Sequence, residues 1–514
     1  MQLIAKITAN KTQLIAVLTF TTAYFFFNIN GALIDNDTVE YIGFAKQFEK
    51  LTIPTSPYYQ PGTGFFIWLI KNLFNINYLQ AFKILNFTSG LLLIIAIIKL
   101  FPSKKANTFM SICLALPPAV LYLSSLLYAD IVFLVFAFWS MVFLLKHVES
   151  LKIKHLILSG VLIAFSIFIK YNGIAMIAGS VLMLFMVFYK ANYKYIKSLI
   201  FKCMLLALPG ILYIVFWKVY NGKLGLVEFT SYMHKVDLNC ILFYIKHNSL
   251  SLYRLAIDRA TLGLTSILSH LYVWGGVIII ATINRRNILL LIKRIKAEAI
   301  EPNILLLSIM AGVYALAVTI MHSLNCYSEP EVRLYSVFFI AIYLLFLILL
   351  DTLIKKFISV KISPIIYIIL IFYIVAIGWR VFSESKKNRI DSKISKYSKV
   401  TDFLNKKQND KPLLGFATQV INRQWFARGR HMEALGVFPV QKHHFHGTDK
   451  LYTDKEYQDQ IENTLRNMPS NNVLIVEFQK GFMERQGSFI ESISPIYVAE
   501  NIYVFKGKSN TLSP

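Results

Sequence analysis

The feature that most constrains this chain is a series of apolar runs, each about as long as a membrane span. A helix rises about 1.5 Å per residue, so about 20 apolar residues cross the roughly 30 Å hydrocarbon core of a bilayer. By that measure we expect a polytopic α-helical membrane protein with about eleven transmembrane helices. The predicted spans lie near residues 12–34, 79–99, 108–128, 130–146, 157–171, 173–190, 198–218, 263–283, 303–322, 334–354 and 362–380.

The basic residues indicate how these helices are oriented. Lys and Arg outnumber Asp and Glu by 53 to 28, but they form no basic face or tail, so nucleic acid is not an expected partner. Most lie in short clusters within alternate loops: 99–105, 146–154, 190–197, 285–296 and 355–361. Because loops rich in Lys and Arg stay in the cytoplasm, the N-terminus is predicted to be cytoplasmic. We expect an integral protein of a bacterial inner membrane, in contact with its lipids.

The hydrophilic segments define the predicted domains. A transmembrane domain is expected at 1–380, with a first outer loop at 35–78, and an extracytoplasmic domain at 381–514. Within the loop, GFFIWLIKNLF (64–74) is apolar but short, and counting it as a span would move every later basic loop outside, so it is predicted to be interfacial or re-entrant. In the tail, NVLIVEF and IYVAENIYVFKG have strand patterns, the second with a turn at Glu500. This predicts a small α/β domain.

Two carboxylates, Asp35 and Asp37, follow the first apolar run in IDNDTVEYIGFAKQF. An acid beside the hydrocarbon is costly, so at this depth carboxylates usually face a water-filled cavity or a cation. The alternative is that they cap the first span and begin the next helix. An apolar stripe at Val39, Ile42 and Ala45 then predicts an interfacial helix, which would hold both acids at the level of the lipid headgroups.

Several motifs together resemble the C superfamily of glycosyltransferases (GT-C), membrane enzymes that use polyprenyl-phosphate sugars. The acidic pair is followed by Tyr41, a Pro-rich P-x-x-x-P-G stretch and a second span. LPPAVLYLSSLLYADIVFLVF places Asp130 where the family has an acidic residue, and Lys170-Tyr171-Asn172-Gly173 is similar to its K-Y-x-G step. Its R-Y-x-x-P element is matched weakly at Arg333, where a leucine intervenes and the proline is absent. Protein O-mannosyltransferases and lipid A aminoarabinose transferases are the nearest by pattern.

The resemblance implies a GT-C-like fold and transfer of a sugar, with inversion, from a polyprenyl-phosphate donor to a lipid, glycan or protein acceptor at the outer face. Such a reaction requires a base for the acceptor and positive charge for the departing phosphate. Asp35 is the predicted base, and Asp37 holds its geometry or helps to bind a divalent metal. The remaining predicted substrate-binding residues are Tyr41, Asp130, Lys170, Tyr171, Arg254, Arg259 and Arg333.

Two assignments among these residues stay open. Each basic residue is also explained by snorkelling to lipid headgroups. Glu329 and Glu331 either pair with Arg333 or join Asp35 and Asp37 in a metal site.

No nucleotide-binding motif occurs in the sequence, so the energy for transfer must reside in the donor's lipid–phosphate bond.

Two other functions fit a chain of this kind. One is an envelope polysaccharide polymerase or ligase, and the other is a non-enzymatic transporter of lipid-linked sugars. Transporters often have internal repeats and polar or broken spans near the bilayer centre. Here no two halves share a pattern, and the polar residues gather at the ends of the spans. Sugar transfer at the outer mouth is therefore the favoured hypothesis.

Overall fold

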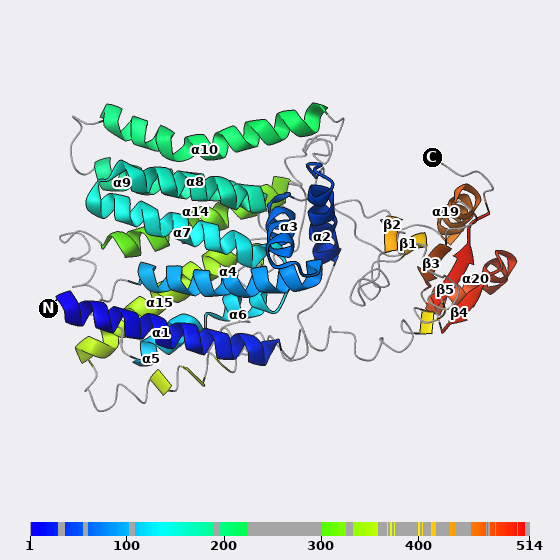
Figure 1. Ribbon diagram of the computed structural model, residues 1–514, viewed down its shortest axis with the longest axis horizontal. Coiled ribbons are helices and arrows are strands. Elements are labelled where there is room, and N and C mark those ends of the chain that lie inside the picture. The colour runs from blue at the N-terminus through cyan, green and yellow to red at the C-terminus, as the bar shows by residue number, and fades with distance from the viewer. Residues whose placement is uncertain are drawn as a thin grey trace. The chain divides into compact units, whose positions relative to one another are not determined.

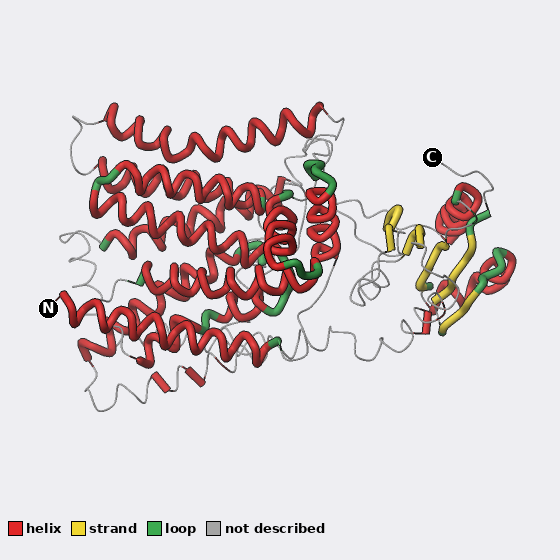
Figure 2. Tube along the Cα trace, in the orientation of Figure 1, coloured by secondary structure: helices red, strands yellow, loops and turns green. Residues whose placement is uncertain are grey.

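The computed structural model describes most of the helical part of the chain and several segments of the C-terminal part. The described residues are 2–28, 36–54, 60–101, 108–189, 196–223, 301–324, 333–357, 367–368, 371–372, 375, 399–400, 403, 413–417, 432–437, 454–468, 470, 473–478, 480–500 and 502–508. The chain divides into two compact units, residues 1–33 with 40–383, and residues 34–39 with 384–514. In their described parts the first is built of helices and the second contains the strands (Figure 2).

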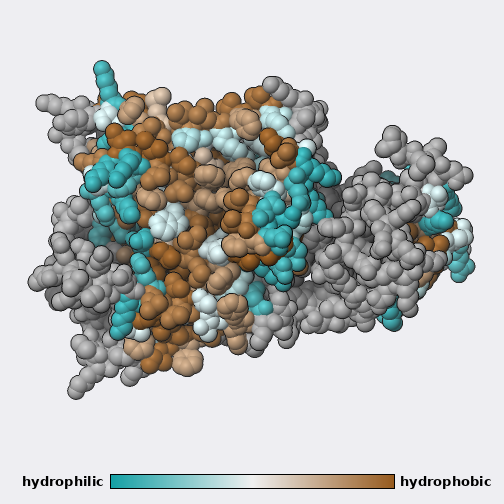
Figure 3. Space-filling view, viewed as in Figure 1, coloured by the Kyte–Doolittle hydropathy of each residue, from teal (hydrophilic) through white to brown (hydrophobic). Residues whose placement is uncertain are grey.

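The first unit is a bundle of long apolar helices that run alongside one another (Figure 1). They are α1 (Gln2–Phe27), α4 (Tyr78–Leu100), α7 (Ala129–Ser150), α8 (Ile153–Ile169), α9 (Ile174–Tyr189), α10 (Ile196–Lys223), α14 (Pro302–Leu324) and α15 (Ser336–Phe357). Within the described residues, five segments are long and apolar enough to cross a membrane: Tyr78–Leu100, Ala129–Ser150, Tyr171–Phe188, Ile196–Tyr220 and Pro302–Met321. Apolar side chains form a belt across the middle of the visible face, with hydrophilic residues at both ends (Figure 3). The protein is therefore an integral membrane protein.

Most predicted spans coincide with helices, and one is wrong. Residues 108–128 form two short helices, α5 (Thr108–Ala115) and α6 (Pro118–Ser124), instead of one span. Pro117 and Pro118 explain the break, because proline lacks an N–H and disfavours helical conformation in the residue before it. The predicted span at 263–283 and most of 362–380 lie outside the described residues.

Two shorter helices, α2 (Asn36–Glu49) and α3 (Gly62–Phe74), run across one end of the bundle, and the N-terminus of the chain lies at the other end (Figure 1). At about 1.5 Å per residue α3 is about 20 Å long, which is too short to cross the hydrocarbon. This agrees with the prediction that residues 64–74 do not span the membrane. An ion pair between Lys71 and Glu49 joins α3 to α2. Asn77 then caps α4, its side chain accepting a hydrogen bond from the Gln80 backbone at 2.8 Å.

Helices α8 and α10 approach each other closely at Gly160. A Cβ atom added there would lie 2.6 Å from the carbonyl oxygen of Leu206, a backbone atom of α10. Small residues allow such close crossings between membrane helices. The crossing matters for the site below, because it sets where the last turn of α8 lies relative to α10.

We expect Gly160→Ala to lower the melting temperature of the detergent-solubilised protein, because the added methyl group must separate two backbones at a cost of about 1–3 kcal/mol. Gly312→Ala is the matched control. Nothing lies within 4 Å of a Cβ atom added at Gly312, and alanine favours a helix over glycine by about 0.5–1 kcal/mol. Equal melting temperatures for the two variants would show that the α8–α10 crossing is not as tight as described.

The second unit contains a five-stranded sheet of order β2-β1-β3-β5-β4. β1 (Leu413–Ala417) is parallel to β2 (Met432–Val437) and β3 (Val473–Glu477). β5 (Ile502–Lys506) is antiparallel to β3 and to β4 (Tyr497–Ala499). Both segments predicted as strands near the C-terminus form strands. Glu500, in the predicted turn, has φ 56°, a left-handed conformation that closes the β4–β5 hairpin.

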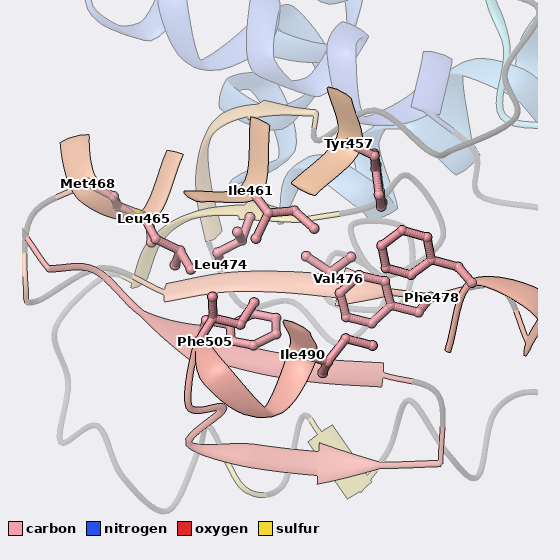
Figure 4. Close-up of a cluster of buried hydrophobic side chains, with 11 residues drawn as sticks. Tyr457, Ile461, Leu465, Met468, Leu474, Val476, Phe478, Ile490 and Phe505 are labelled. Carbon is pink, nitrogen blue, oxygen red and sulfur yellow. The ribbon is translucent and has the colours of Figure 1, made fainter. Parts of the chain in front are cut away.

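Helices α19 (Asp454–Asn467) and α20 (Lys480–Ser492) contribute to a hydrophobic core with β3 and β5 (Figure 4). Tyr457 and Ile461 of α19 are in this cluster with Val476 of β3 and Phe505 of β5. Arg485 of α20 also donates a hydrogen bond of 2.7 Å from Nε to a carboxylate oxygen of Asp454. This core stabilises the C-terminal unit.

Candidate functional site

A buried ion pair lies where α7 begins and α8 ends. Asp130 is in the first turn of α7, and Lys170 follows the last residue of α8. The Lys170 Nζ lies 2.5 Å from the Asp130 Oδ1, and the two side chains are 20% and 4% exposed, respectively. The positive end of the α7 dipole also stabilises the carboxylate. Removing one partner of such a pair is costly, because the other charge then stays buried without compensation.

The residues after Lys170 form a tight junction between α8 and α9. Lys170 is extended, with φ −155° and ψ 132°, and Tyr171–Gly173 form one turn of 3-10 helix. Gly173 has no room for a side chain, because an added Cβ would lie 2.6 Å from the Ile167 backbone nitrogen. The K-Y-x-G step therefore needs its glycine, and it holds Lys170, Tyr171 and Asn172 at this end of the bundle.

Three buried polar groups gather beside the ion pair. Asn172, Tyr314 of α14 and Ser336 of α15 are each less than 10% exposed. The Tyr314 hydroxyl interacts electrostatically with both of these residues and with Asp130. Even so, the Asn172 Nδ2, the Tyr314 hydroxyl and the Ser336 hydroxyl make no well-formed hydrogen bond within the described part of the chain. Buried polar groups in this state usually bind water or a ligand.

Arg333 lies close to the same helix end. Its guanidinium carbon is 5.1 Å from the ring centroid of Tyr128, the residue that precedes α7. Next to it in the chain, the buried Tyr335 hydroxyl lies 2.9 Å from the Thr319 hydroxyl of α14. The start of α15 therefore packs against the start of α7 and the end of α14. Two of the basic residues predicted to bind substrate, Lys170 and Arg333, consequently lie near the same end of α7.

The first turn of α3 is wedged between α2 and the last turn of α8. A Cβ atom at Gly62 would lie 2.5 Å from the carbonyl oxygen of Phe168, and one at Gly64 would overlap the Cβ of Phe44. Glycine at these two positions therefore permits the close approach. It brings the N-terminus of α3 next to the junction that carries Lys170.

This helix start has the properties of an anion site. Pro61, at its N-cap, makes no side-chain hydrogen bond to the free N–H groups. Gln60 is 2% exposed and Thr63 is fully buried, and neither the Gln60 Nε2 nor the Thr63 hydroxyl has a partner among the residues that the structure describes. The first N–H groups of a helix and the positive end of its dipole attract anions such as phosphate. Two further donors beside them strengthen that attraction.

A side chain of α10 binds the oxygen of the Gln60 amide. The Tyr213 hydroxyl donates a hydrogen bond to the Gln60 Oε1 at 2.5 Å. The Trp217 indole donates to the Tyr171 hydroxyl at 2.8 Å, and Tyr171 in turn interacts electrostatically with Gln60. The start of α3 is thus connected through side chains to both α10 and the α8–α9 junction.

The structure does not bring the other predicted site residues together with Lys170 and Asp130. Asp37 lies in the first turn of α2 and is half-buried. Tyr41 is only 5% exposed and packs edge-on against Phe44 and Phe82, so its position is that of a core residue. The remaining predicted site residues lie outside the described residues: Asp35, Arg254, Arg259, Glu329 and Glu331. Among the residues described, no group of three or more His, Cys, Asp or Glu side chains could hold a metal ion.

Sequence reasoning missed Gln60, Thr63 and Tyr314. The proline and glycine at residues 61 and 62 entered the sequence analysis only as part of the Pro-rich P-x-x-x-P-G stretch. A stronger signal was available, because P-G-T-G opens a short apolar helix without a capping Ser, Thr, Asp or Asn, which leaves its N–H groups free. No sequence pattern pointed to Tyr314, which lies within the predicted span 303–322.

Comparison with known proteins identifies relatives of this fold. Residues 56–217 match a family described as dolichyl-phosphate-mannose-protein mannosyltransferase. Among solved structures, ArnT from Cupriavidus metallidurans in the apo state aligns with a TM-score of 0.57 and 12% identity, covering 98% of each chain. The same protein bound to undecaprenyl phosphate aligns with a TM-score of 0.54 and 11% identity, covering 98% of this chain and 99% of that chain. No curated protein sequence matches this chain. The predicted resemblance to GT-C membrane glycosyltransferases is confirmed, and at these identities the structural likeness shows a shared fold.

Proposed function

We propose that this protein is an integral membrane glycosyltransferase that takes its sugar from a polyprenyl-phosphate donor. One observation supports the proposal most strongly. The anion site at the start of α3 adjoins the Lys170–Asp130 pair, and both lie within residues 56–217, the segment that matches the mannosyltransferase family. ArnT, a lipid A aminoarabinose transferase of the same fold, is bound to undecaprenyl phosphate in one of its structures.

The phosphate of the donor would bind at the start of α3. The amide of Gln60, the hydroxyl of Thr63 and the first backbone N–H groups supply donors, and the helix dipole supplies positive charge. Lys170 adds a full charge. Its ammonium group has three N–H donors, of which Asp130 uses one, so the others are available to a phosphate oxygen. Hydrogen bonds between charged groups are about twice as strong as those between neutral groups.

The transfer step then follows from these charges. An acceptor hydroxyl or amine attacks the anomeric carbon of the sugar while the bond to the phosphate oxygen breaks. The electron pair leaves with the lipid phosphate, where Lys170 and the α3 donors stabilise the developing charge. The acceptor proton passes to a carboxylate, which we assign to Asp35, with Asp37 holding its geometry. Attack from the face opposite the phosphate inverts the configuration of the sugar.

The proposal also includes the side of the membrane on which transfer takes place and the class of the acceptor. Lys146 and Lys152 flank the turn between α7 and α8, at the opposite ends of these helices from Asp130 and Lys170. By the positive-inside rule the lysine-rich end faces the cytoplasm, so transfer takes place at the extracytoplasmic face of a bacterial inner membrane. The acceptor is a lipid, protein or envelope glycan at that face. If Asp35, Asp37, Glu329 and Glu331 bind a divalent metal, a chelator will reduce transfer and added metal will restore it.

Binding of undecaprenyl phosphate to the purified protein tests the donor site. We expect Gln60→Glu to weaken binding about 10- to 100-fold, because a carboxylate replaces a donor to a charged group, worth about 1.5–3 kcal/mol. Gln47→Glu, which adds the same charge to α2, is the control and should change the affinity less than twofold. A wild-type protein that does not bind the lipid would refute the donor class. Equal affinities for wild type and Gln60→Glu would remove the α3 start as the phosphate site.

A further inference from the structure

A second group of polar side chains lies at the end of the bundle opposite the Lys170–Asp130 pair, where α7 and α9 end. Its centre is His147, which is fully buried in the last turn of α7. Leu151 closes the turn into α8 in a left-handed conformation, and its N–H donates to the carbonyl oxygen of His147 at 2.7 Å. The His147 Nδ1 lies 3.0 Å from the carbonyl oxygen of Lys152. The imidazole is thereby held by the turn between α7 and α8.

The hydrogen bond to Lys152 fixes which nitrogen of the His147 ring carries a proton. A carbonyl oxygen can only accept, so Nδ1 must be the donor. Nε2 is then an acceptor in the neutral ring and a second donor in the protonated ring. This Nε2 is buried and has no hydrogen-bond partner within the described ranges of the chain. A buried polar atom in this state usually binds water or a ligand.

Basic side chains lie near the same ring. His147 interacts electrostatically with Lys202 of α10 and His155 of α8. The Lys202 Nζ lies 4.0 Å from the ring centroid of Phe188 in α9, which is 6.1 Å from the ring centroid of His147. No ion pair between residues that the structure describes includes Lys202. Helices α7, α8 and α10 therefore bring together side chains whose only possible charge is positive.

An anion would complete this group. It would pair with Lys202 and favour the protonated form of His147, whose Nε2–H would donate to it. By the positive-inside rule the lysine-rich turn between α7 and α8 faces the cytoplasm. The cytoplasmic leaflet carries anionic lipids, and basic pockets between membrane helices on that side bind their headgroups.

The surroundings of Lys202 favour a lipid over a free anion. Phe201 and Met204, its neighbours on α10, are both exposed, and such apolar side chains would contact the acyl chains below a headgroup. We propose that Lys202 and His147 form a binding site for the phosphate of an anionic phospholipid of the cytoplasmic leaflet. This site is separate from the donor site at α3 and does not depend on the proposed sugar transfer.

Native mass spectrometry of the purified protein with phosphatidylglycerol tests the site. We expect the wild type to bind this lipid more tightly than phosphatidylcholine, whose choline group neutralises its own phosphate. Lys202→Met removes the ammonium group and should weaken the tightest binding about tenfold, the size expected for one hydrogen bond to a charged group. His147→Asn should cause a loss of similar size. The asparagine amide can still donate to the Lys152 carbonyl, as Nδ1 does, but it has no group at the position of Nε2.

Lys197→Met is the matched control, because it removes the same charge from an exposed position of α10. It should change the affinity less than twofold, and melting temperatures verify that each variant is folded. An equal loss in Lys197→Met and Lys202→Met, an unchanged affinity in Lys202→Met, or no preference for phosphatidylglycerol would overturn the site. Displacement of the lipid by excess inorganic phosphate would overturn a lipid as its occupant. None of these results would bear on sugar transfer.

Discussion

Replacing Lys170 with methionine should abolish sugar transfer and lower the stability of the protein. The Asp130 side chain is 4% exposed and its Oδ1 is paired with Lys170. Leaving a buried charge without its partner typically costs about 3–5 kcal/mol. Transfer is lost for a separate reason, because the departing phosphate loses its cation. Thermal melting in detergent measures the first effect, and turnover of a polyprenyl-phosphate sugar measures the second.

The double variant Lys170→Met/Asp130→Asn separates these two effects. Neutralising both partners removes the buried unpaired charge, so we expect stability to recover toward wild type while transfer stays absent. Lys71→Met is the control, because it breaks the exposed pair with Glu49, whose side chains are 22% and 44% exposed. Exposed pairs are worth about 0–1 kcal/mol. Transfer by a folded Lys170→Met variant would mean that Lys170 does not stabilise the leaving phosphate.

Replacing Asp35 with asparagine should reduce transfer about 10²- to 10⁴-fold, the usual contribution of a general base. Binding of undecaprenyl phosphate should be unchanged, because the carboxylate acts on the acceptor. The assay therefore compares turnover and donor affinity in the same preparation. A loss of both together would indicate a binding or folding role.

Asp37→Asn is the informative comparison. Asp37 lies in the first turn of α2, where an acid stabilises the helix by about 0.3–1 kcal/mol through its dipole. If that is its only role, the variant has a slightly lower melting temperature and an unchanged rate of transfer. If it holds the geometry of Asp35, turnover falls without a change in donor affinity. Full turnover in Asp35→Asn would remove Asp35 as the base.

The helical part of the fold that could be predicted consists of the long apolar helices. A span must satisfy its backbone hydrogen bonds internally and present apolar side chains, so each span leaves a long apolar run in the sequence. Seven predicted spans coincide with helices for this reason: 79–99, 130–146, 157–171, 173–190, 198–218, 303–322 and 334–354. Run length alone failed at 108–128, because it does not register the break that Pro117 and Pro118 impose.

The sequence allowed some residues of the site to be predicted, but it did not allow their contacts to be predicted. Asp130 and Lys170 were each nominated as substrate-binding residues, yet nothing in their local sequence indicates that they pair across 40 positions. The same holds for Gln60 and Tyr213, which are bonded across 153 positions. Periodicity describes which face of a helix is apolar. It does not describe which polar groups meet where helices end, and those contacts depend on how the bundle packs.

Sugar transfer from a polyprenyl-phosphate donor is tested most directly by a transfer assay with the purified protein in proteoliposomes. Polyprenyl-phosphate sugars labelled in the sugar are supplied one at a time, with a cell-envelope extract as acceptor. We expect that at least one donor is consumed, that label appears in the acceptor with release of polyprenyl phosphate, and that Lys170→Met/Asp130→Asn gives neither product. A folded wild-type protein that binds undecaprenyl phosphate but consumes none of the donors would contradict sugar transfer and favour transport or polymer ligation.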